Sequence, residues 1–326
     1  MNVCVVGYGA IGPLHAKTVS SLKGVKLYAI CDIDRKRAEK GAKEHGVKAM
    51  YSFERVLADK NIDSVHICTP HYLHYSMIVK ALDAGKKVVC EKPIVMTEEE
   101  FKKLLAHPKS DEVCVVMQNR LNPCIREFKE IADSKDFGEV CGIKGMLTWC
   151  RDQEYYDSDE WRGTWSKEGG GVMINQAIHT LDYFSYIGGK IKSVNAIMAN
   201  FSLKGIIEVE DTMAVHMVYE NGIKGIFLAT NAFSEHSDPY FEIVFEKGVL
   251  RYEDGRLLVN GECITEDQKA DGRKWYWGLS HEALIGEFYK IGKHFNVKDV
   301  KDTMELMFAC YKSAKSGQEI VLTKQP

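Results

Sequence analysis

The stretch VCVVGYGAIG at residues 3–12 decides the fold of this chain. Val3–Val6 is a short apolar run rich in β-formers, and Gly7, Gly9 and Gly12 follow it and lead into a segment with helical spacing. In a strand–turn–helix unit the first glycine makes the tight turn, the second lets the backbone approach a pyrophosphate, and the third lets the helix pack closely on the strand. The pyrophosphate would lie on free N–H groups at the helix N-terminus, where the helix dipole favours an anion. The stretch therefore predicts a dinucleotide-binding unit.

An acidic residue follows at the spacing that such a unit requires. A second apolar run, Val25–Ile30, leads to Asp32, about 20 residues beyond the last glycine, where a carboxylate binds the ribose hydroxyls. Asp32 could instead cap the next helix, but Asp34 fits the capping position better. An acid at this place repels a 2′-phosphate, so we expect NAD as the cofactor, while Arg35 keeps NADP possible.

Length and charge restrict the class of protein. A chain of 326 residues is too long for one ordinary core and suits two domains. A net charge of −3 with mixed signs gives no basic surface for nucleic acid and none for an anionic membrane. The apolar runs are far shorter than the roughly 18 residues of a membrane span, and the chain starts with a strand instead of a signal sequence. We expect a soluble, cytoplasmic protein with neither nucleic acid nor a membrane as a partner.

The ten cysteines are scattered and have no C-x-x-C spacing. Those within predicted strands are Cys4, Cys31, Cys68, Cys90 and Cys114. We expect them to be reduced, buried, small apolar side chains. Nothing in the sequence clusters like a zinc site, so no metal is expected.

Residues 1–118 alternate between β-rich runs and helical spacing. The runs lie at residues 3–6, 26–31, 64–68, 87–90 and 113–117. This alternation predicts a Rossmann domain, an α/β fold with a doubly wound parallel sheet. Ligands of such sheets lie beyond the carboxyl ends of the strands. One crevice should therefore be lined by Gly7, Asp32, Thr69, Pro70, Glu91 and Lys92.

Residues 119–326 have a different pattern of secondary-structure signals. A helix is expected from Asn122-Pro123 to Ala132, and longer strands with hairpin signals follow, such as Asn221-Gly222 between Thr212–Tyr219 and Ile223–Thr230. A second signal is Asp254-Gly255, which separates strands at 249–252 and 256–259. Helical spacing returns at residues 281–293 and 303–316, before a closing strand near 320–322. These signals predict a C-terminal α+β domain with an open, mostly antiparallel sheet.

The strand expected at Ile191–Phe201 carries apolar residues on both faces. One face would pack on helices, and the other needs a cover that a second subunit could provide. We therefore expect a homo-oligomer, either a dimer or a tetramer.

Several motifs together resemble the Gfo/Idh/MocA oxidoreductases over essentially the whole chain. The resemblance implies a nicotinamide cofactor and sugar or cyclitol substrates. Within the family, the run from Trp161 to Gln176 looks closest to the sugar-oxidising members, including those acting at C3 of UDP-sugars. The motifs are the glycine fingerprint, Thr69–His74, the stretch from Ala84-Gly85 to Glu91-Lys92-Pro93, Trp161-Arg162, Gly169–Gly171, and Asn175, His179 and Asp182.

The chain departs from the family at Asn175, where many members have an aspartate. An amide can hydrogen-bond a sugar hydroxyl but cannot take its proton. His179, four residues later and so on the same helix face, becomes the leading candidate for the general base. Lys92 would stabilise the developing alkoxide or relay the proton. In the alternative readings His179 is a hydrogen-bonded histidine in the wall between the two domains, and Lys92 is a solvated residue at the start of a helix.

Other roles stay open at the level of sequence. Glu91 could contact the nicotinamide ribose, orient Lys92 or form a simple ion pair, and His74 could line the cofactor crevice or cap its helix. Trp161, Arg162 and Trp165 could form a sugar-binding rim, although tryptophan is more often a core residue. The expected cofactor contacts are Gly7, Tyr8, Gly9, Ala10, Ile11, Gly12, Asp32, Thr69, Pro70, His74, Glu91, Lys92 and Gln118. The expected substrate contacts are Lys92, Arg120, Trp161, Arg162, Asn175 and His179.

We expect an NAD(P)-dependent oxidoreductase that moves a hydride between a secondary hydroxyl of a sugar, sugar derivative or cyclitol and the nicotinamide. Two other readings remain. The scaffold could serve a non-catalytic sensor of NAD or sugar, since fold does not fix function, or the enzyme could keep its cofactor bound and recycle it internally. The sequence does not name the sugar.

Overall fold

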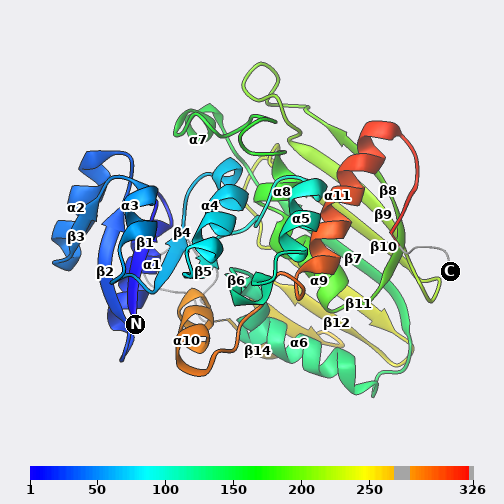
Figure 1. The fold of residues 1–326 in the computed structure, drawn as a ribbon. Coiled ribbons are helices and arrows are strands. Elements are labelled where there is room, and N and C mark those ends of the chain that lie inside the picture. Colours follow the sequence, from blue (N-terminus) through cyan, green and yellow to red (C-terminus); the bar gives the residue numbers. More distant parts are fainter. Residues whose placement is uncertain (268–279, 323–326) are drawn as a thin grey trace. The chain divides into compact units, whose positions relative to one another are not determined.

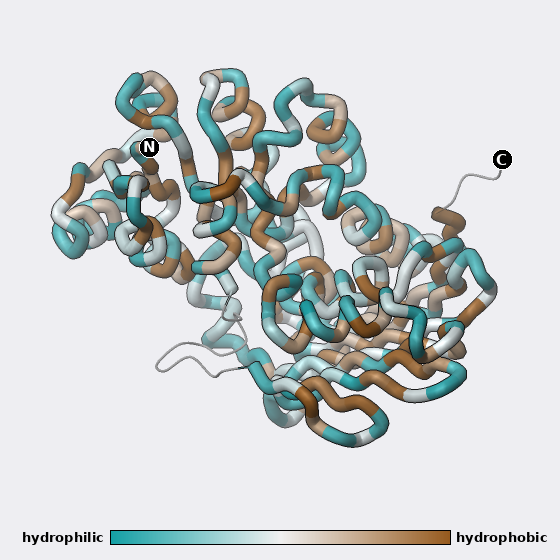
Figure 2. The backbone as a smooth tube through the Cα atoms, turned by 90° about the horizontal axis from the view of Figure 1, so that it is seen from below, coloured by the Kyte–Doolittle hydropathy of each residue, from teal (hydrophilic) through white to brown (hydrophobic). Residues whose placement is uncertain are grey.

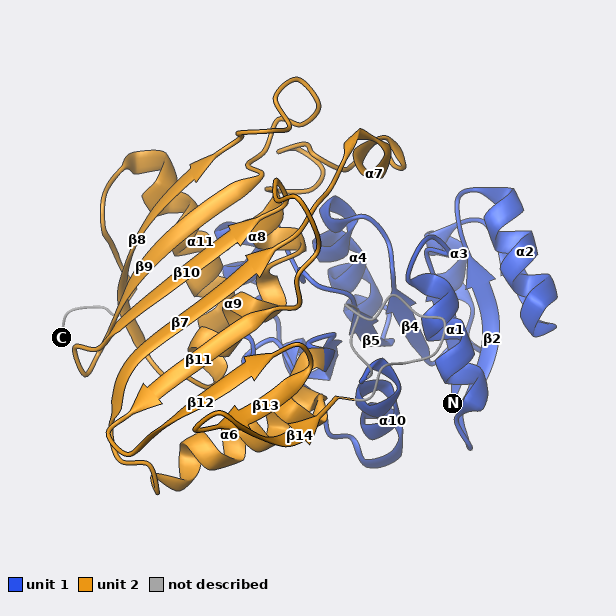
Figure 3. Cartoon of the chain, turned by 180° about the vertical axis from the view of Figure 1, so that it is seen from behind, with its two compact units in different colours: residues 1–118, 280–300 blue, residues 119–279, 301–326 orange. Residues whose placement is uncertain are grey.

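A computed structural model describes residues 1–267 and 280–322 of the chain. The chain divides into two compact units (Figure 3), of which the first holds Met1–Gln118 and Ser280–Val300 and the second holds Asn119–Leu279 and Lys301–Pro326. The first segment of the first unit ends at Gln118. Residues 280–300 differ from the prediction, because the sequence assigns them to the second domain and they cluster with the first.

The first unit is built on a six-stranded parallel sheet with the order β3-β2-β1-β4-β5-β6 (Figure 1). This order confirms the predicted Rossmann fold. The short edge strand β3 has no counterpart among the predicted strands. The strands are β1 (Asn2–Val6), β2 (Lys26–Cys31), β3 (Lys48–Met50), β4 (Ser64–Ile67), β5 (Lys87–Cys90) and β6 (Val113–Val115). The helices are α1 (Gly12–Ser21), α2 (Arg35–His45), α3 (Phe53–Ala58), α4 (His71–Asp83), α5 (Glu98–Leu105) and α10 (His281–Ile291).

The glycines of the fingerprint turn have the backbone demands that the sequence predicts. Gly7 has a φ of +91°, and a Cβ there would lie 2.5 Å from the carbonyl oxygen of Cys68. A Cβ on Gly12 would overlap the carbonyl oxygen of Gly7. At Gly9 the nearest atom to such a Cβ is 3.8 Å away. The first and third glycines therefore serve close packing, and the second leaves open space beside the backbone.

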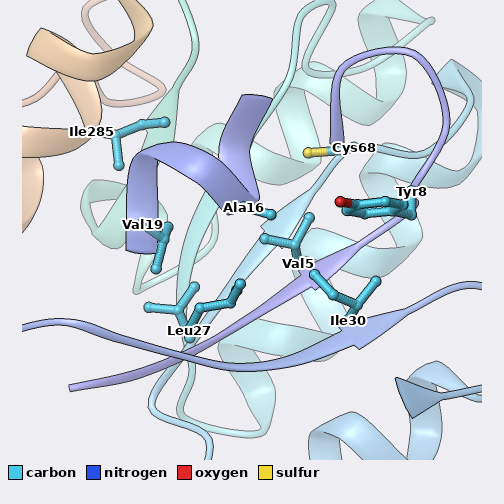
Figure 4. Packing of buried hydrophobic residues seen from close by; sticks show 9 residues of the cluster. Val5, Tyr8, Ala16, Val19, Leu27, Ile30, Cys68 and Ile285 are labelled. Atoms are coloured by element: carbon cyan, nitrogen blue, oxygen red, sulfur yellow. The ribbon is translucent and has the colours of Figure 1, made fainter. Parts of the chain in front are cut away.

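The core of the first unit explains why residues 280–300 belong to it. Ile285 of α10 is fully buried in the same cluster as Val5, Ala16 and Val19 (Figure 4). The backbone N–H of Val115, at the end of β6, donates to the carbonyl of Phe295 over 2.8 Å. Sequence periodicity predicts that α10 is a helix but not which core it joins. The five cysteines expected in strands are all buried.

The second unit contains a nine-stranded sheet with the order β14-β13-β12-β11-β7-β10-β9-β8-β15. Its neighbours are antiparallel except β7 and β10, which run parallel. The predicted open, mostly antiparallel sheet is thereby confirmed. The strands are β7 (Val140–Thr148), β8 (Ile191–Ala199), β9 (Thr212–Tyr219), β10 (Lys224–Thr230), β11 (Tyr240–Phe245), β12 (Gly248–Glu253), β13 (Arg256–Val259), β14 (Glu262–Glu266) and β15 (Ile320–Val321). The helices are α6 (Pro123–Ser134), α7 (Gln153–Asp157), α8 (Val172–Asn175), α9 (Ile178–Tyr186) and α11 (Lys301–Ser316).

Helices α8, α9 and α11 lie on one face of this sheet (Figures 1 and 3). On that face Phe184 of α9 packs against Phe227 and Phe241, with ring centroids 5.3 and 5.2 Å apart. The opposite face exposes Met146, Leu228 and Ile197, which face one another across β7, β10 and β8 with Ala214 of β9 in the same row. An apolar row of this kind is what the two-sided strand pattern predicts.

Hydrophobic residues occur in short stretches along the described chain (Figure 2). Among the residues that the structure describes, no helix has the length and apolar character to cross a membrane.

Candidate active site

Asp32 is tied to the fingerprint turn. Its Oδ2 accepts from the backbone N–H of Tyr8 over 2.7 Å, and its Oδ1 accepts from the N–H of Asp34 over 2.9 Å. Capping of α2 falls to Asp34, whose carboxylate accepts from the N–H of Lys36 over 2.8 Å. Each carboxylate oxygen has a second acceptor site, so Asp32 can bind ribose hydroxyls while it holds the turn.

Backbone hydrogen bonds bring three predicted segments to one edge of the sheet. The N–H of Gly7, after β1, donates to Cys31 over 2.8 Å, and the N–H of Cys68, after β4, donates to Val6 over 2.8 Å. The N–H of Glu91, after β5, donates to Ile67 over 3.0 Å. The fingerprint turn, the Thr69-Pro70 segment and the Glu91–Pro93 segment therefore follow neighbouring strands at their carboxyl ends, where ligands of such sheets bind.

His74 connects two of these segments. Its side chain is fully buried, with Nδ1 2.7 Å from the carbonyl oxygen of Pro93 and Nε2 2.7 Å from that of Thr69. Lys92, which is partly buried, precedes Pro93 through a cis peptide bond. His74 therefore lies between the backbone before α4 and the backbone after Lys92, and a neutral ring donates to one of the two carbonyl oxygens. Neither sequence reading of this histidine included this position.

Glu91 is a buried acceptor for two histidines. Its Oε1 lies 2.9 Å from Nε2 of His15 in α1 and 3.4 Å from Nε2 of His281 in α10. Burial alone would raise the pKa of Glu91, but hydrogen bonds from the two histidines hold that pKa well below its ordinary value. The contacts with His15 and His281 are ones that none of the three sequence readings of Glu91 included. One ligand atom from each of the three residues lies within 4.8 Å of the others, so they are also close enough to hold a metal ion.

In the second unit, Asn175 ends α8 and His179 lies in the first turn of α9. The sequence predicts one continuous helix here, whereas the structure has two helices separated by Gln176 and Ala177. Both side chains are 8% exposed. Nδ2 of Asn175 donates to Oε1 of Glu168 over 2.5 Å, and this contact orients the amide.

Glu168 is a functional candidate that the sequence did not indicate. It is 1% exposed, and its Oε2 accepts from the backbone N–H of Gly163 over 2.5 Å. Burial raises the pKa of Glu168 to about 7. Only its position directly before the triple glycine Gly169–Gly171 could have drawn attention to it.

The remaining predicted substrate contacts divide into two groups. Arg162 stacks on the rings of Tyr155 and Trp161 at 4.5 and 4.7 Å, and its Nη1 donates to the Tyr155 hydroxyl over 2.5 Å. Arg120 is 3% exposed and forms a two-point ion pair with Asp182, over 2.8 and 2.6 Å. We assign Arg120 to the interior of the second unit and do not carry it into the proposed substrate site.

Two family models cover most of the chain. Residues 1–119 match an oxidoreductase family with an NAD-binding Rossmann fold, and residues 125–251 match the Gfo/Idh/MocA C-terminal domain. The scyllo-inositol 2-dehydrogenase (NAD(+)) of Bacillus subtilis (strain 168) is 30% identical, with 99% of this chain and 96% of that protein covered. The chain belongs to the Gfo/Idh/MocA oxidoreductase family. The match to an NAD-binding family agrees with three features of the structure, namely the open backbone at Gly9, the close packing at Gly7 and Gly12, and the carboxylate of Asp32.

Other proteins similar to this chain are named with different compounds. The levoglucosan dehydrogenase of Pseudarthrobacter phenanthrenivorans is 25% identical and aligns with 86% of this chain and 81% of its own length. Among solved structures, the WlbA dehydrogenase of Chromobacterium violaceum, in complex with NADH and UDP-GlcNAcA, has a TM-score of 0.88 and is 26% identical. That match covers 100% of this chain and 97% of the solved one. The family is therefore established, and its members differ in substrate.

Proposed function

We propose that this protein is an NAD-dependent dehydrogenase that oxidises a secondary hydroxyl of a sugar, sugar derivative or cyclitol. The observation that carries the proposal is the convergence of the fingerprint turn, Thr69 and Glu91–Pro93 at one edge of the Rossmann sheet. This geometry supports a dinucleotide on the turn with Lys92 close to its reactive end. Relatives named as inositol and levoglucosan dehydrogenases support the substrate class.

Each protein group has a separate task in this proposal. The nicotinamide supplies the hydride acceptor. The Lys92 ammonium donates a hydrogen bond to the substrate hydroxyl and stabilises negative charge as it develops on that oxygen. His179 accepts the hydroxyl proton. Asn175 hydrogen-bonds another substrate hydroxyl through its amide. Trp161 and Arg162 form a rim against the sugar ring.

We also propose that the protein self-associates through the open face of its nine-stranded sheet. Met146, Leu228 and Ile197 are 42%, 37% and 70% exposed and lie in one row across neighbouring strands. Continuous apolar surface of this kind marks an interaction site in soluble proteins. An identical face on a second subunit would cover it.

The test of the activity is a substrate panel with two cofactors. Initial rates of NAD reduction are measured with inositols, anhydrosugars, free hexoses and nucleotide sugars, and the rates with NADP are measured in parallel. We expect turnover with at least one class and a preference for NAD. NAD binding without turnover of any class would favour a sensor. Nicotinamide that purifies with the protein would favour an internally recycled cofactor.

A pH profile tests the assignment of the base. If His179 takes the proton, kcat/KM for oxidation should rise through one ionisation near neutrality, and His179→Ala should remove that rise with most of the activity. Asn175→Asp replaces the amide that donates to Glu168 with a second carboxyl group, and if that group ionises it should favour the imidazolium of His179 and move the rise to higher pH. Activity in the double variant Asn175→Asp, His179→Ala would show that the two positions are interchangeable proton acceptors and would contradict the assignment.

A further inference from the structure

A buried hydrogen-bonded chain runs from Glu91 into the interior of the first unit. Nε2 of His15 lies 2.9 Å from Glu91, and Nδ1 of His15 lies 2.9 Å from Nδ1 of His66 in β4. Nε2 of His66 is 2.8 Å from the hydroxyl of Tyr289, which is 2.7 Å from the hydroxyl of Ser64. Both histidines are fully buried, so their ring nitrogens must find partners within the protein.

Counting protons along this chain fixes the direction of its first bond. The contact between the two Nδ1 atoms holds one proton, because one nitrogen must donate and the other accept. An ionised Glu91 can only accept. His15 therefore bears a proton on Nε2 in both its neutral and its cationic form.

The segment that carries Lys92 is held by histidines on both sides. Before Lys92, the Glu91 carboxylate is bound by His15, and His281 approaches the same oxygen. After Lys92, the carbonyl oxygen of Pro93 lies 2.7 Å from Nδ1 of His74. A short segment fixed at both flanks leaves little freedom to the backbone between them.

We propose that His15 is a positioning residue for the reaction, because its Nε2–H fixes the Glu91 side chain and the backbone carries that constraint to Lys92. The kinetic consequence of this inference rests on the proposed function, whereas the contact itself exists without a substrate. The same atoms of His15, Glu91 and His281 could instead hold a metal ion. The hydrogen bonds that continue from His15 through His66 to Tyr289 favour a proton, and not a metal ion, between His15 and Glu91.

Nuclear magnetic resonance of protein labelled with ¹⁵N-histidine tests the contact directly. Long-range ¹H–¹⁵N spectra distinguish protonated from unprotonated ring nitrogens, and the His15 signals are those that disappear in His15→Leu. We expect a protonated Nε2 on His15. An unprotonated Nε2, whether from the other tautomer or from a bound metal ion, would overturn the inference.

A second experiment follows Lys92 without any substrate. Reductive methylation with ¹³C-formaldehyde gives each lysine a methyl signal, and that of Lys92 is the one absent from Lys92→Ala. We expect His15→Leu to shift this signal and His15→Gln to leave it near its parent position, because a glutamine amide can still donate to Glu91. His107→Gln is the matched control, since His107 contacts Asp83 at the end of α4 instead. An unshifted Lys92 signal in His15→Leu would overturn the inference.

Kinetics of the same variants give the third readout. In His15→Leu we expect kcat to fall by about tenfold to a hundredfold, the scale of a misplaced catalytic group, with the dissociation constant for NAD changed only a few-fold. His15→Gln should recover most of the loss. Equal losses in both variants would show that ring packing matters instead of the hydrogen bond. If the parent protein oxidises no substrate, the proposed function fails, while the two resonance experiments still decide the contact.

Discussion

Glu168 is the residue whose protonation should most affect the second unit near neutral pH. Its carboxylate is 1% exposed and accepts from both Asn175 and the backbone of Gly163. Because burial raises its pKa to about 7, the folded protein holds this proton more tightly than the unfolded chain does. Glu168 therefore favours the folded state at low pH and loses that contribution as the pH rises through the folded pKa.

This difference predicts a pH dependence of stability. The free energy of unfolding should lose roughly 3 kcal/mol through Glu168 between about pH 4.5 and pH 7. We expect urea unfolding at pH 5 and pH 8 to show a smaller difference in Glu168→Gln than in the parent protein. Burial raises the pKa of Glu210 to about 6, so Glu210 also lowers the free energy of unfolding as the pH rises. Both proteins contain Glu210. Equal differences in the two proteins would contradict the assigned pKa.

Lys92 should matter for turnover and little for cofactor binding. In the proposed function the fingerprint turn and Asp32 hold the cofactor, and Lys92→Ala leaves both in place. We expect that variant to lose at least about a hundredfold in kcat, the scale of one preorganised transition-state donor, with the dissociation constant for NAD changed only a few-fold. Lys87→Ala is the matched control, since Lys87 is an exposed residue at the start of β5, the strand that the Lys92 segment follows. Turnover within a few-fold of the parent would remove Lys92 from the mechanism.

Among individual residues, the sequence identifies those whose residue type is required by the local backbone geometry. The glycines of the fingerprint and Asp32 lie at fixed offsets from one strand, so a short window contains the physical reason for each. His15, His281 and Glu168 lack such a signal. The contacts of His15 and His281 with Glu91 join residues far apart in the chain. Glu168 contacts Gly163 and Asn175 nearby, through a turn that carries no recognisable motif.

The strand–turn–helix element at the N-terminus should tolerate no side chain at Gly12. A Cβ there would overlap the carbonyl oxygen of Gly7 and separate α1 from β1. We expect Gly12→Ala to lower the free energy of unfolding by about 3 kcal/mol and to abolish measurable NAD binding. The control is Gly286→Ala in α10, where the nearest atom would lie 3.7 Å away. Calorimetry of both variants with and without NAD makes the comparison, and unimpaired binding by Gly12→Ala would refute the role of close packing.

Hairpins were predictable because their turns carry their own signals. Asp254 and Gly255 have φ of +50° and +69°, as a two-residue hairpin turn with two left-handed positions requires. Strands β7 and β11 were not predicted from the sequence. β7 lies between β11 and β10, so its pairing joins distant segments and leaves no turn signature beside it.

For the whole molecule, the exposed row on the nine-stranded sheet predicts an oligomer. We expect light scattering at micromolar concentration to give the mass of a dimer or tetramer. Placing charges in the row with Ile197→Lys and Leu228→Lys should reduce that mass, because a buried unpaired charge is costly. Ile291→Lys is the control, since Ile291 is 69% exposed at the end of α10 in the first unit. A monomeric mass for the parent protein would contradict the proposed interface.

The placement of Ser280–Val300 in the first unit has a consequence for biosynthesis. Residues 1–118 leave the ribosome long before Ile285, His281 and Tyr289 are synthesised. Part of the core of the nascent Rossmann sheet therefore stays uncovered until those residues are made. A fragment that ends at residue 118 should bind a hydrophobic dye and resist proteolysis poorly, and addition of a peptide spanning residues 280–300 should reverse both effects. The unit with the NAD-binding Rossmann fold is therefore encoded first but completed only when most of the second unit has been made.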